Sequence, residues 1–356
     1  MRRLDLAVAG GRKTQSIIDA CASASSGSRI LVLTYTQVNQ AVIRKRLAAC
    51  GAISARVEVM GWFSFLLSHW IRPYLPLRFA GCRLRGLNFD GESHQYATGK
   101  TRFLDGEEKA YKRHLARLAT EVGDASSGAV LDRVTRIYDT IFIDEVQDLN
   151  GYDLEVLDAL LDAPIALRMV GDIRQAVVAT NPRDPKNRQY KGLKIKNWFD
   201  KQVSASRLEV RHSSTTWRSN QAIADFADSI FEPSWGFAQT QSENGAQTGH
   251  DGIFVLSEAD AEAYARDFKP LCLRHSVAIA REVDLPFVNI VPAKGRDVER
   301  VLIWPTKGVR EFLRTGKRLD ATPSCSLYVA VTRAQASAAF VVDDPRAYPL
   351  PEWSAS

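Results

Sequence analysis

Short apolar runs alternate with helical patterns along most of the 356 residues, and this alternation limits the possible folds more than any other feature. The runs Ile30–Tyr35, Thr140–Asp144 and Ile165–Asp172 have the composition of buried strands. Helical patterns such as Asn39–Ala49 lie between them. Strands and helices in this order form parallel sheets covered by helices. We therefore predict an α/β fold with parallel sheets.

The strand–helix pattern occurs in two successive series. In the first series the pattern breaks over about residues 75–135, a polar stretch in which only one charged helix, Glu107–Glu121, is expected. A second series begins near Arg207. We predict two domains, residues 1–205 with an insertion at about 75–135, and residues 206–356.

Composition limits the class of protein only broadly. The chain is 45% apolar and 25% charged, and its net charge of +6 is compatible with a polyanionic partner without requiring one. No stretch is long and apolar enough for a membrane span, and the apolar run at the N-terminus is too short for a signal peptide. The cysteines and histidines show no metal-ligand spacing, and His114 is expected at the surface. These features predict a cytoplasmic protein without a membrane partner.

The first strand leads into a glycine-rich turn, AVAGGRKT, at residues 7–14. Backbone N–H groups in such a turn, together with a helix N-terminus, bind phosphate, while Lys13 bridges phosphates and the Thr14 hydroxyl holds Mg²⁺. Arg12 stands where this pattern has a glycine, and a plain strand–turn–helix is the alternative. The candidate nucleotide-binding residues of this turn are Gly10, Gly11, Arg12, Lys13, Thr14 and Gln15.

A second motif, IFIDEVQD, delivers two adjacent carboxylates at the end of a buried strand. Burying charge there is costly unless the carboxylates have a task. In phosphoryl transfer Asp144 would bind Mg²⁺ and Glu145 would take a proton from the attacking water. The alternative is an Asp–Glu pair that caps the next helix.

These two motifs and five others resemble, in their order, the UvrD/Rep branch of superfamily-one DNA helicases. The others are LVLTYTQVNQAVIRKRL (31–47), GDIRQ (171–175), TWRS (216–219), and AKGRDVERVLI (293–303) with LYVAVTRA (327–334). The resemblance implies two RecA-like P-loop domains that bind ATP and Mg²⁺. It implies that Gln175 senses the γ-phosphate, that Trp217 stacks on adenine, and that Arg218 and Arg333 neutralise phosphate charge. It also assigns Lys294, Gly295 and Asp297 to ATP binding, and Tyr35, Thr36 and Asn39 to DNA.

The chain departs from the family at several positions. Val178 and Thr180 stand where the family has two aromatic residues that stack on single-stranded bases. The chain is also about half as long as full helicases of this kind, so processive unwinding is not expected. Compact members of the family occur as ATPase subunits of bacterial anti-phage systems such as Gabija, beside a nuclease.

Two smaller features have alternative interpretations. The basic loop Arg183–Lys196 either follows a phosphodiester backbone or is a solvated charged loop. The aromatic residues of the stretch 62–70 are expected to lie mostly in the core, although the family contacts DNA there.

The resemblance predicts an ATP-dependent, helicase-like DNA motor acting on single-stranded DNA. The alternative is a nucleotide-sensing ATPase subunit that gates a partner nuclease in phage defence. A third hypothesis is a protein that keeps the fold, hydrolyses nothing and docks to DNA.

Overall fold

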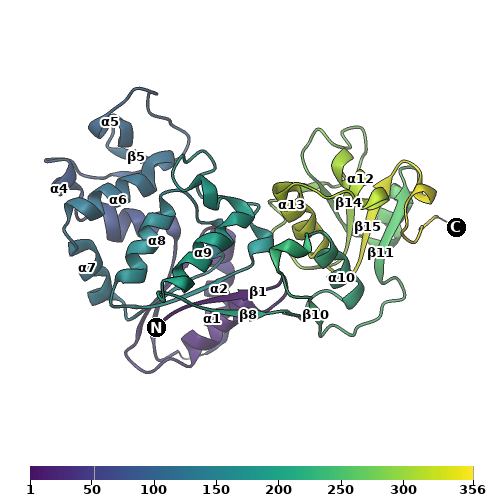
Figure 1. Cartoon of the computed structure of the whole chain (residues 1–356), viewed down its shortest axis with the longest axis horizontal. Helices are drawn as coiled ribbons and strands as arrows, with labels where there is room; N and C mark the ends of the chain where they lie inside the picture. Colours follow the sequence, from purple (N-terminus) through teal and green to yellow (C-terminus); the bar gives the residue numbers. More distant parts are fainter. Residues whose placement is uncertain (52, 356) are drawn as a thin grey trace. The chain divides into compact units, whose positions relative to one another are not determined.

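The computed structural model describes residues 1–51 and 53–355, which divide into two compact units. Unit 1 comprises residues 1–6, 13–171 and 179–211, and unit 2 comprises residues 7–12, 172–178 and 212–356. The glycine-rich turn and the GDIRQ segment are therefore divided: their residues 7–12 and 172–175 group with unit 2. The domain boundary near residue 205 stays a prediction. Figure 1 shows the elements of both units along the chain.

Unit 1 is built on a six-stranded sheet with strand order β3-β2-β6-β7-β1-β8. The pairs β1·β7, β2·β3, β2·β6 and β6·β7 are all parallel. The strands are β1 (Arg2–Ala7), β2 (Arg29–Thr34), β3 (Arg56–Gly61), β6 (Thr140–Ile143), β7 (Ala166–Gly171) and β8 (Glu209–Ser213). Because parallel strands end at one edge, the segments that follow β1, β2 and β6 share that edge.

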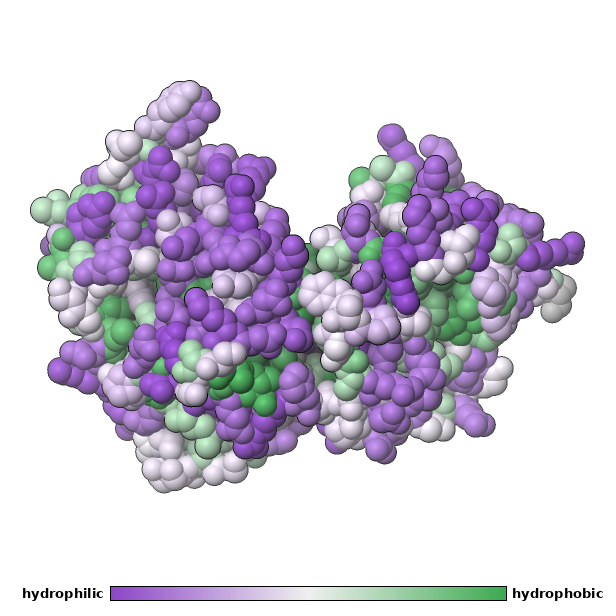
Figure 2. Space-filling view, viewed as in Figure 1, coloured by the Kyte–Doolittle hydropathy of each residue, from purple (hydrophilic) through white to green (hydrophobic). Residues whose placement is uncertain are grey.

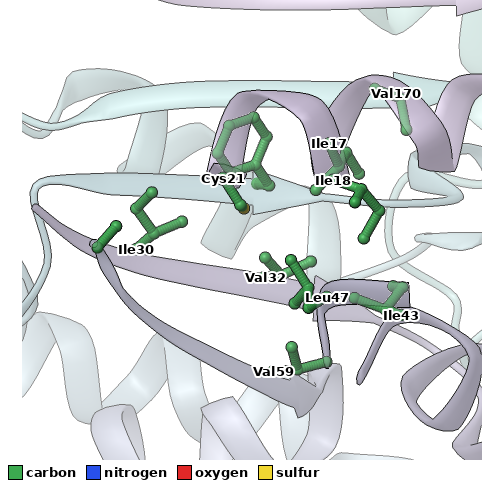
Figure 3. Packing of buried hydrophobic residues seen from close by; sticks show 11 residues of the cluster. Ile17, Ile18, Cys21, Ile30, Val32, Ile43, Leu47, Val59 and Val170 are labelled. Atoms are coloured by element: carbon green, nitrogen blue, oxygen red, sulfur yellow. The ribbon is translucent and has the colours of Figure 1, made fainter. Parts of the chain in front are cut away.

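The helices of unit 1 are α1 (Lys13–Ala22), α2 (Gln37–Ala49), α3 (Trp62–Phe65), α4 (Leu75–Arg78), α5 (Gly99–Phe103), α6 (Leu115–Ala125), α7 (Ala129–Ile137), α8 (Asp153–Asp162) and α9 (Ile195–Ser204). Helices α1 and α2 pack on the sheet through a cluster of buried apolar side chains (Figure 3). Ile17 and Ile18 of α1 and Ile43 of α2 meet Val32 of β2 there. This core fixes the start of α1, and with it Lys13 and Thr14.

Residues 75–135 lie outside the six-stranded sheet. They form α4 to α7 and a small parallel sheet of β4 (Gly86–Asn88) and β5 (Lys109–Tyr111). The helix predicted over Glu107–Glu121 is wrong in its first half, because residues 109–111 pair with β4 and α6 starts only at Leu115. Helix α6 buries Leu115, Leu118 and Val122 and packs against α8.

The aromatic stretch after β3 is mostly core, as expected. Helix α3 continues into a π-helical segment, Leu66–Ile71. Trp62, Phe65 and Trp70 are buried, and only Phe63 is half-exposed, with its ring edge-on to Tyr35.

Unit 2 contains a five-stranded sheet with strand order β11-β15-β14-β12-β13, parallel throughout. Its strands are β11 (Gly252–Ser257), β12 (Leu271–Arg274), β13 (Val288–Asn289), β14 (Val298–Trp304) and β15 (Ala334–Val342). A separate parallel pair joins β9 (Thr215–Thr216) to β10 (Gln241–Ser242). The helices are α10 (Gln221–Ser229), α11 (Ala261–Phe268), α12 (Lys307–Thr315) and α13 (Ala321–Val331).

The two sheets, parallel in every pair described above and with helices between their strands, confirm the predicted α/β fold class with an insertion in the first sheet region. Hydrophilic side chains cover most of the face in Figure 2, and green patches are small. Within residues 1–51 and 53–355, no helix has the length and apolar character needed to cross a membrane.

Candidate nucleotide site

The glycine-rich turn after β1 packs closely against the TTWRS segment of unit 2. Gly10 adopts φ 73°, and a Cβ at this position would lie 2.5 Å from the Thr216 hydroxyl oxygen and 2.6 Å from Cβ of Arg218. The Trp217 N–H donates to the Gly10 carbonyl oxygen at 3.2 Å. A side chain at position 10 would therefore push these two segments apart.

Arg12 takes a left-handed backbone conformation, with φ 55°. This conformation costs a residue with a Cβ about 1–2 kcal/mol, which explains why the resembling pattern has glycine here. The exposed Arg12 guanidinium lies 4.4 Å above the centre of the Trp217 ring. The side chain therefore contacts the ring that the resemblance assigns to adenine.

In unit 1 two predicted motifs meet directly. The Thr14 hydroxyl donates to Asp144 Oδ2 at 3.1 Å, across 130 residues of sequence. Thr14 lies in the first turn of α1, and Asp144 directly follows β6. Asp144 is buried, and burial together with the neighbouring Glu145 charge raises the pKa of its carboxyl above the usual range. The Thr14 hydrogen bond and Lys13 act in the opposite direction.

Glu145 is held in an unusual backbone conformation. Its φ is 57°, a left-handed value that costs about 1–3 kcal/mol in a residue other than glycine. Its side chain is half-buried and accepts a hydrogen bond from Gln147 Nε2. The Glu145 N–H donates to Asp144 Oδ1 at 3.0 Å, so the strained turn places both carboxylates at the same edge of the sheet.

The residues around Asp144 suit a divalent cation of the Mg²⁺ type. Mg²⁺ prefers hard oxygen ligands and uses few protein groups, typically one or two carboxylates. A hydroxyl oxygen and a buried carboxylate oxygen already lie within 3.1 Å of each other at Thr14 and Asp144. A cation between them would favour the ionised carboxylate, which burial alone disfavours.

In unit 2 Gln175 and Arg333 lie together in a buried network. Arg333 Nη2 donates to Gln175 Oε1 at 3.5 Å, and Gln175 Nε2 donates to Asp172 Oδ2 at 3.0 Å. The Tyr328 hydroxyl also donates to Asp172 Oδ2, at 3.0 Å, and accepts the Ala9 N–H at 3.1 Å. The network therefore connects both predicted phosphate sensors to the glycine-rich turn.

Sequence reasoning missed three members of this network, Asp172, Arg174 and Tyr328. Arg174 is buried, donates to Asp228 Oδ1 at 2.6 Å and lies 4.7 Å from the Tyr328 ring centre. The sequence feature that could have indicated these residues is polar groups next to apolar runs: two charged residues in GDIRQ and a tyrosine in the apolar LYVAV run. Such groups need polar partners when they are buried.

Arg218 is fixed by two contacts within unit 2. Arg218 Nη2 lies 2.7 Å from Asp297 Oδ1, and Nη1 donates to the Thr332 carbonyl oxygen at 3.0 Å. Asp297 immediately precedes β14, and Arg333 immediately precedes β15, its neighbour in the sheet. Lys294 and Gly295, which has φ 90°, lie in the turn just before Asp297. Three predicted arginine and aspartate residues thus lie at the amino end of one sheet.

The remaining predicted residues have local structural partners. Gln15 Nε2 donates to Asp19 Oδ1 at 2.8 Å along α1. The Thr36 hydroxyl accepts the Asn39 N–H at 3.1 Å and so caps α2, and Tyr35 lies edge-on to Phe63 at 5.6 Å.

Thr180 stands at one of the two positions where the resembling family has an aromatic residue that stacks on bases, and its side chain does not face solvent. It is 1% exposed, and its hydroxyl lies within hydrogen-bond distance of Asn150 Oδ1, at 2.7 Å, and of Asp153 Oδ2. Trp62 Nε1 donates to Asp153 Oδ1 at 2.6 Å. This position therefore belongs to a buried polar network, which a stacking ring in the same place could not form.

Comparison with known proteins places the site in context. Residues 109–187 match the family model of the UvrD/REP helicase N-terminal domain, a segment that includes Asp144, Glu145 and Gln175. No curated protein matches the chain. Two similar solved structures are those of the arterivirus nonstructural protein 10 helicase, alone and in a complex with DNA. They are 13% and 11% identical, both with a TM-score of 0.48, over 96% and 97% of this chain. The chain covers only 59% and 62% of those helicase chains.

The family match shows that residues 109–187 are similar to the N-terminal domain of UvrD/REP helicases, and the parallel sheets agree with the predicted α/β fold. The roles of individual residues stay predictions, as do the Gabija-type assignment and the cytoplasmic location.

Proposed function

We propose that this chain is an ATP hydrolase of the helicase type whose turnover is coupled to single-stranded DNA. The observation that carries the proposal is the hydrogen bond from Thr14 to Asp144 at 3.1 Å, beside Glu145. It joins the end of the glycine-rich turn to the acidic motif at one edge of a parallel sheet. A hydroxyl, a buried carboxylate and a second carboxylate in this arrangement are what metal-assisted phosphoryl transfer requires.

In this proposal Lys13 and the N–H groups at the start of α1 bind the phosphates. Thr14 and Asp144 would hold Mg²⁺, and the ion would supply positive charge to the phosphate oxygens. Glu145 accepts the proton of the attacking water, and the Gln147 amide keeps its carboxylate oriented.

The proposal assigns the residues of unit 2 to charge neutralisation and base binding. Gln175 senses the γ-phosphate, and Arg333, only 1% exposed and held by the Val329 carbonyl oxygen at 3.0 Å, neutralises phosphate charge. Arg218 is the second cation, and a phosphate oxygen would compete with Asp297 for it. Trp217, 39% exposed, provides the stacking face for adenine. Lys294 and Gly295, in the next motif along the sequence, are the further candidate ATP-binding residues.

DNA is the partner that the helicase-type match favours, and Tyr35, Thr36 and Asn39 are the candidate contacts. The half-exposed Tyr35 and Phe63 rings, 5.6 Å apart, are suited to stack on unpaired bases.

The second candidate is a nucleotide-sensing subunit that gates a partner nuclease, as in anti-phage systems. Two observations favour it. Arg12 covers one face of Trp217, and Thr180 is buried where a base-stacking ring would be needed for a motor.

Phosphate release by the purified chain, with and without oligo(dT), tests the proposal and separates the two candidates. A motor predicts Mg²⁺-dependent hydrolysis that oligo(dT) raises several-fold. Slow hydrolysis that oligo(dT) leaves unchanged would favour the sensing subunit. No hydrolysis under any condition would contradict both.

A further inference from the structure

Unit 1 contains a small basic cavity whose lining includes none of the candidate nucleotide-binding residues. Its volume is about 110 Å³, far below the roughly 300–1,000 Å³ of sites for drug-sized ligands, so it suits a single small group. The lining residues are Arg102, Arg113, His114, Arg117, Tyr152, Asn181, Arg183, Asp184 and Pro185. We call this cavity the arginine pocket.

The arginine pocket is assembled from distant parts of the chain. Arg102 lies in α5, Arg113 in the 3₁₀ turn before α6, and Arg117 in the first turn of α6. Arg183 comes from the basic loop that follows β7. A chance run of neighbouring basic residues therefore does not account for the pocket.

Carboxylates balance these arginines only in part. Arg113 and Arg183 share Glu92, at 3.1 and 2.8 Å, each through Nη1. Arg117 pairs with Glu121 through Nε at 3.1 Å, and Glu121 also binds Arg78. A guanidinium carries five N–H donors in a planar fork, so each of these pairs leaves donors for another acceptor.

The one carboxylate in the lining is already engaged by other groups. Asp184 accepts the Tyr152 N–H at 3.2 Å and the Lys186 N–H at 2.9 Å, as well as Asn181 Nδ2 at 3.3 Å. Gly151 permits this packing, because a Cβ there would lie 2.4 Å from Asp184 Cγ. Asp184 thus stabilises the wall of the pocket, and its oxygens accept hydrogen bonds from backbone and amide N–H groups.

The pKa of His114 reflects the burial and the positive charges of the arginine pocket. Burial, followed by the charges of Arg113, Arg102 and Arg117, lowers the pKa of His114 to about 4. The ring is therefore neutral at pH 7, and it is half-buried rather than fully exposed. Burial disfavours a charge of either sign, whereas the three arginine charges, which disfavour a protonated His114, attract an anion.

We propose that the arginine pocket binds a backbone phosphate of a single nucleic-acid strand. This inference deepens the proposed function, because it rests on a DNA-coupled activity, and it names where one phosphate of the strand is held.

The Tyr152 ring favours nucleic acid over an acidic protein segment. Arg117 and Lys186 both lie 5.8 Å from the centre of this half-buried ring. An aromatic ring beside arginines can stack a base while the guanidiniums bind the adjoining phosphate. An acidic peptide would use the arginines but not the ring.

The test compares two double variants of the full chain in binding fluorescent oligo(dT) over a range of salt concentrations. Arg113→Gln/Arg183→Gln removes two exposed pocket arginines, whose side chains are 41% and 72% exposed. Arg85→Gln/Arg211→Gln removes two arginines that are 73% and 56% exposed and lie outside the pocket. Both variants lose the same charge, so general electrostatic attraction changes equally.

The pocket variant should bind about tenfold more weakly than the control, as expected for lost charge-assisted hydrogen bonds. The slope of log affinity against log salt should fall by about 0.7 for one lost phosphate contact. Equal affinity and slope in the two variants would overturn the inference. Equal competition by poly(Glu) and unlabelled oligo(dT) would also overturn it, in favour of an acidic protein surface.

A second readout needs no substitution. NMR titration of His114 with inorganic phosphate, and separately with oligo(dT), should raise the pKa of the ring toward its ordinary value. A His114 pKa that neither ligand moves would contradict the site, and a response to inorganic phosphate alone would show an anion site that no strand reaches. If the wild type binds oligo(dT) through the pocket but releases no phosphate from ATP, the proposed function fails while this site stands.

Discussion

The Arg12 guanidinium lies 4.4 Å above the centre of the Trp217 indole, so a residue that replaces a glycine covers the ring expected to bind adenine. Arg12 is exposed and Trp217 is 39% exposed. At such a site a cation–π contact contributes about 0.5–1 kcal/mol. A base that stacks on this face must first displace the guanidinium.

Replacing Arg12 with glycine should therefore strengthen adenosine binding about two- to fivefold. Adenosine carries no phosphate, so any attraction between Arg12 and phosphates does not enter the measurement. Isothermal titration calorimetry measures the affinity, and Arg12→Lys, which keeps a cation, should lie closer to the wild type. Weaker adenosine binding by Arg12→Gly would show that the guanidinium supports the base.

Tyr328→Phe should loosen the glycine-rich turn. The hydroxyl accepts the Ala9 N–H at 3.1 Å and donates to Asp172 at 3.0 Å, and its loss leaves a buried donor unsatisfied at a cost of about 1–3 kcal/mol. Hydrogen exchange at the Ala9 amide should accelerate at least tenfold. Tyr348→Phe is the control, because the Tyr348 hydroxyl donates to Asp343 at 3.0 Å instead. Unchanged exchange at Ala9 in Tyr328→Phe would refute the link.

The buried Asp153 should make unit 1 less stable as pH rises. Burial raises its pKa from 3.8 to about 6, against hydrogen bonds from Thr180 and Trp62. Because the folded-state pKa lies above the unfolded one, the protonated form favours folding below pH 4. That contribution, up to about 3 kcal/mol, is lost as pH rises through 6.

Asp153→Asn should remove this dependence. The amide can still accept from Trp62, and it can donate to the Thr180 hydroxyl, which donates in turn to Asn150 at 2.7 Å. Urea unfolding at pH 4 and pH 7.5 should show a smaller loss of stability with pH in the variant than in the wild type. Parallel losses in the two proteins would contradict the raised pKa.

Sequence patterns predicted the elements that bury one apolar face, but not all of the strands. Strand β3 was not foreseen, because Arg56 and Glu58 interrupt its apolar pattern and its pairing with β2 supplies the stability. Residues 109–111 form a strand where the sequence predicts helix, because their partner β4 lies more than twenty residues away in sequence. Pairing over such distances leaves no local signal.

The candidate site was foreseen in its residue types and not in its contacts. Thr14, Asp144, Gln175 and Arg333 were named from motifs, and the hydrogen bonds that join them in pairs come from the folded chain. The partner of Arg12 and the burial of Thr180 could not be foreseen, because each depends on residues far away in sequence.

The most direct measurement of the central claim is ATP binding and turnover by Glu145→Gln. The substitution removes the proposed base and keeps the size of the side chain, so ATP should bind with wild-type affinity while phosphate release falls about 10²–10⁴-fold. Glu258→Gln, an exposed position outside the candidate site, makes the same charge change and should retain wild-type turnover. Full phosphate release by Glu145→Gln, with or without oligo(dT), would contradict the account.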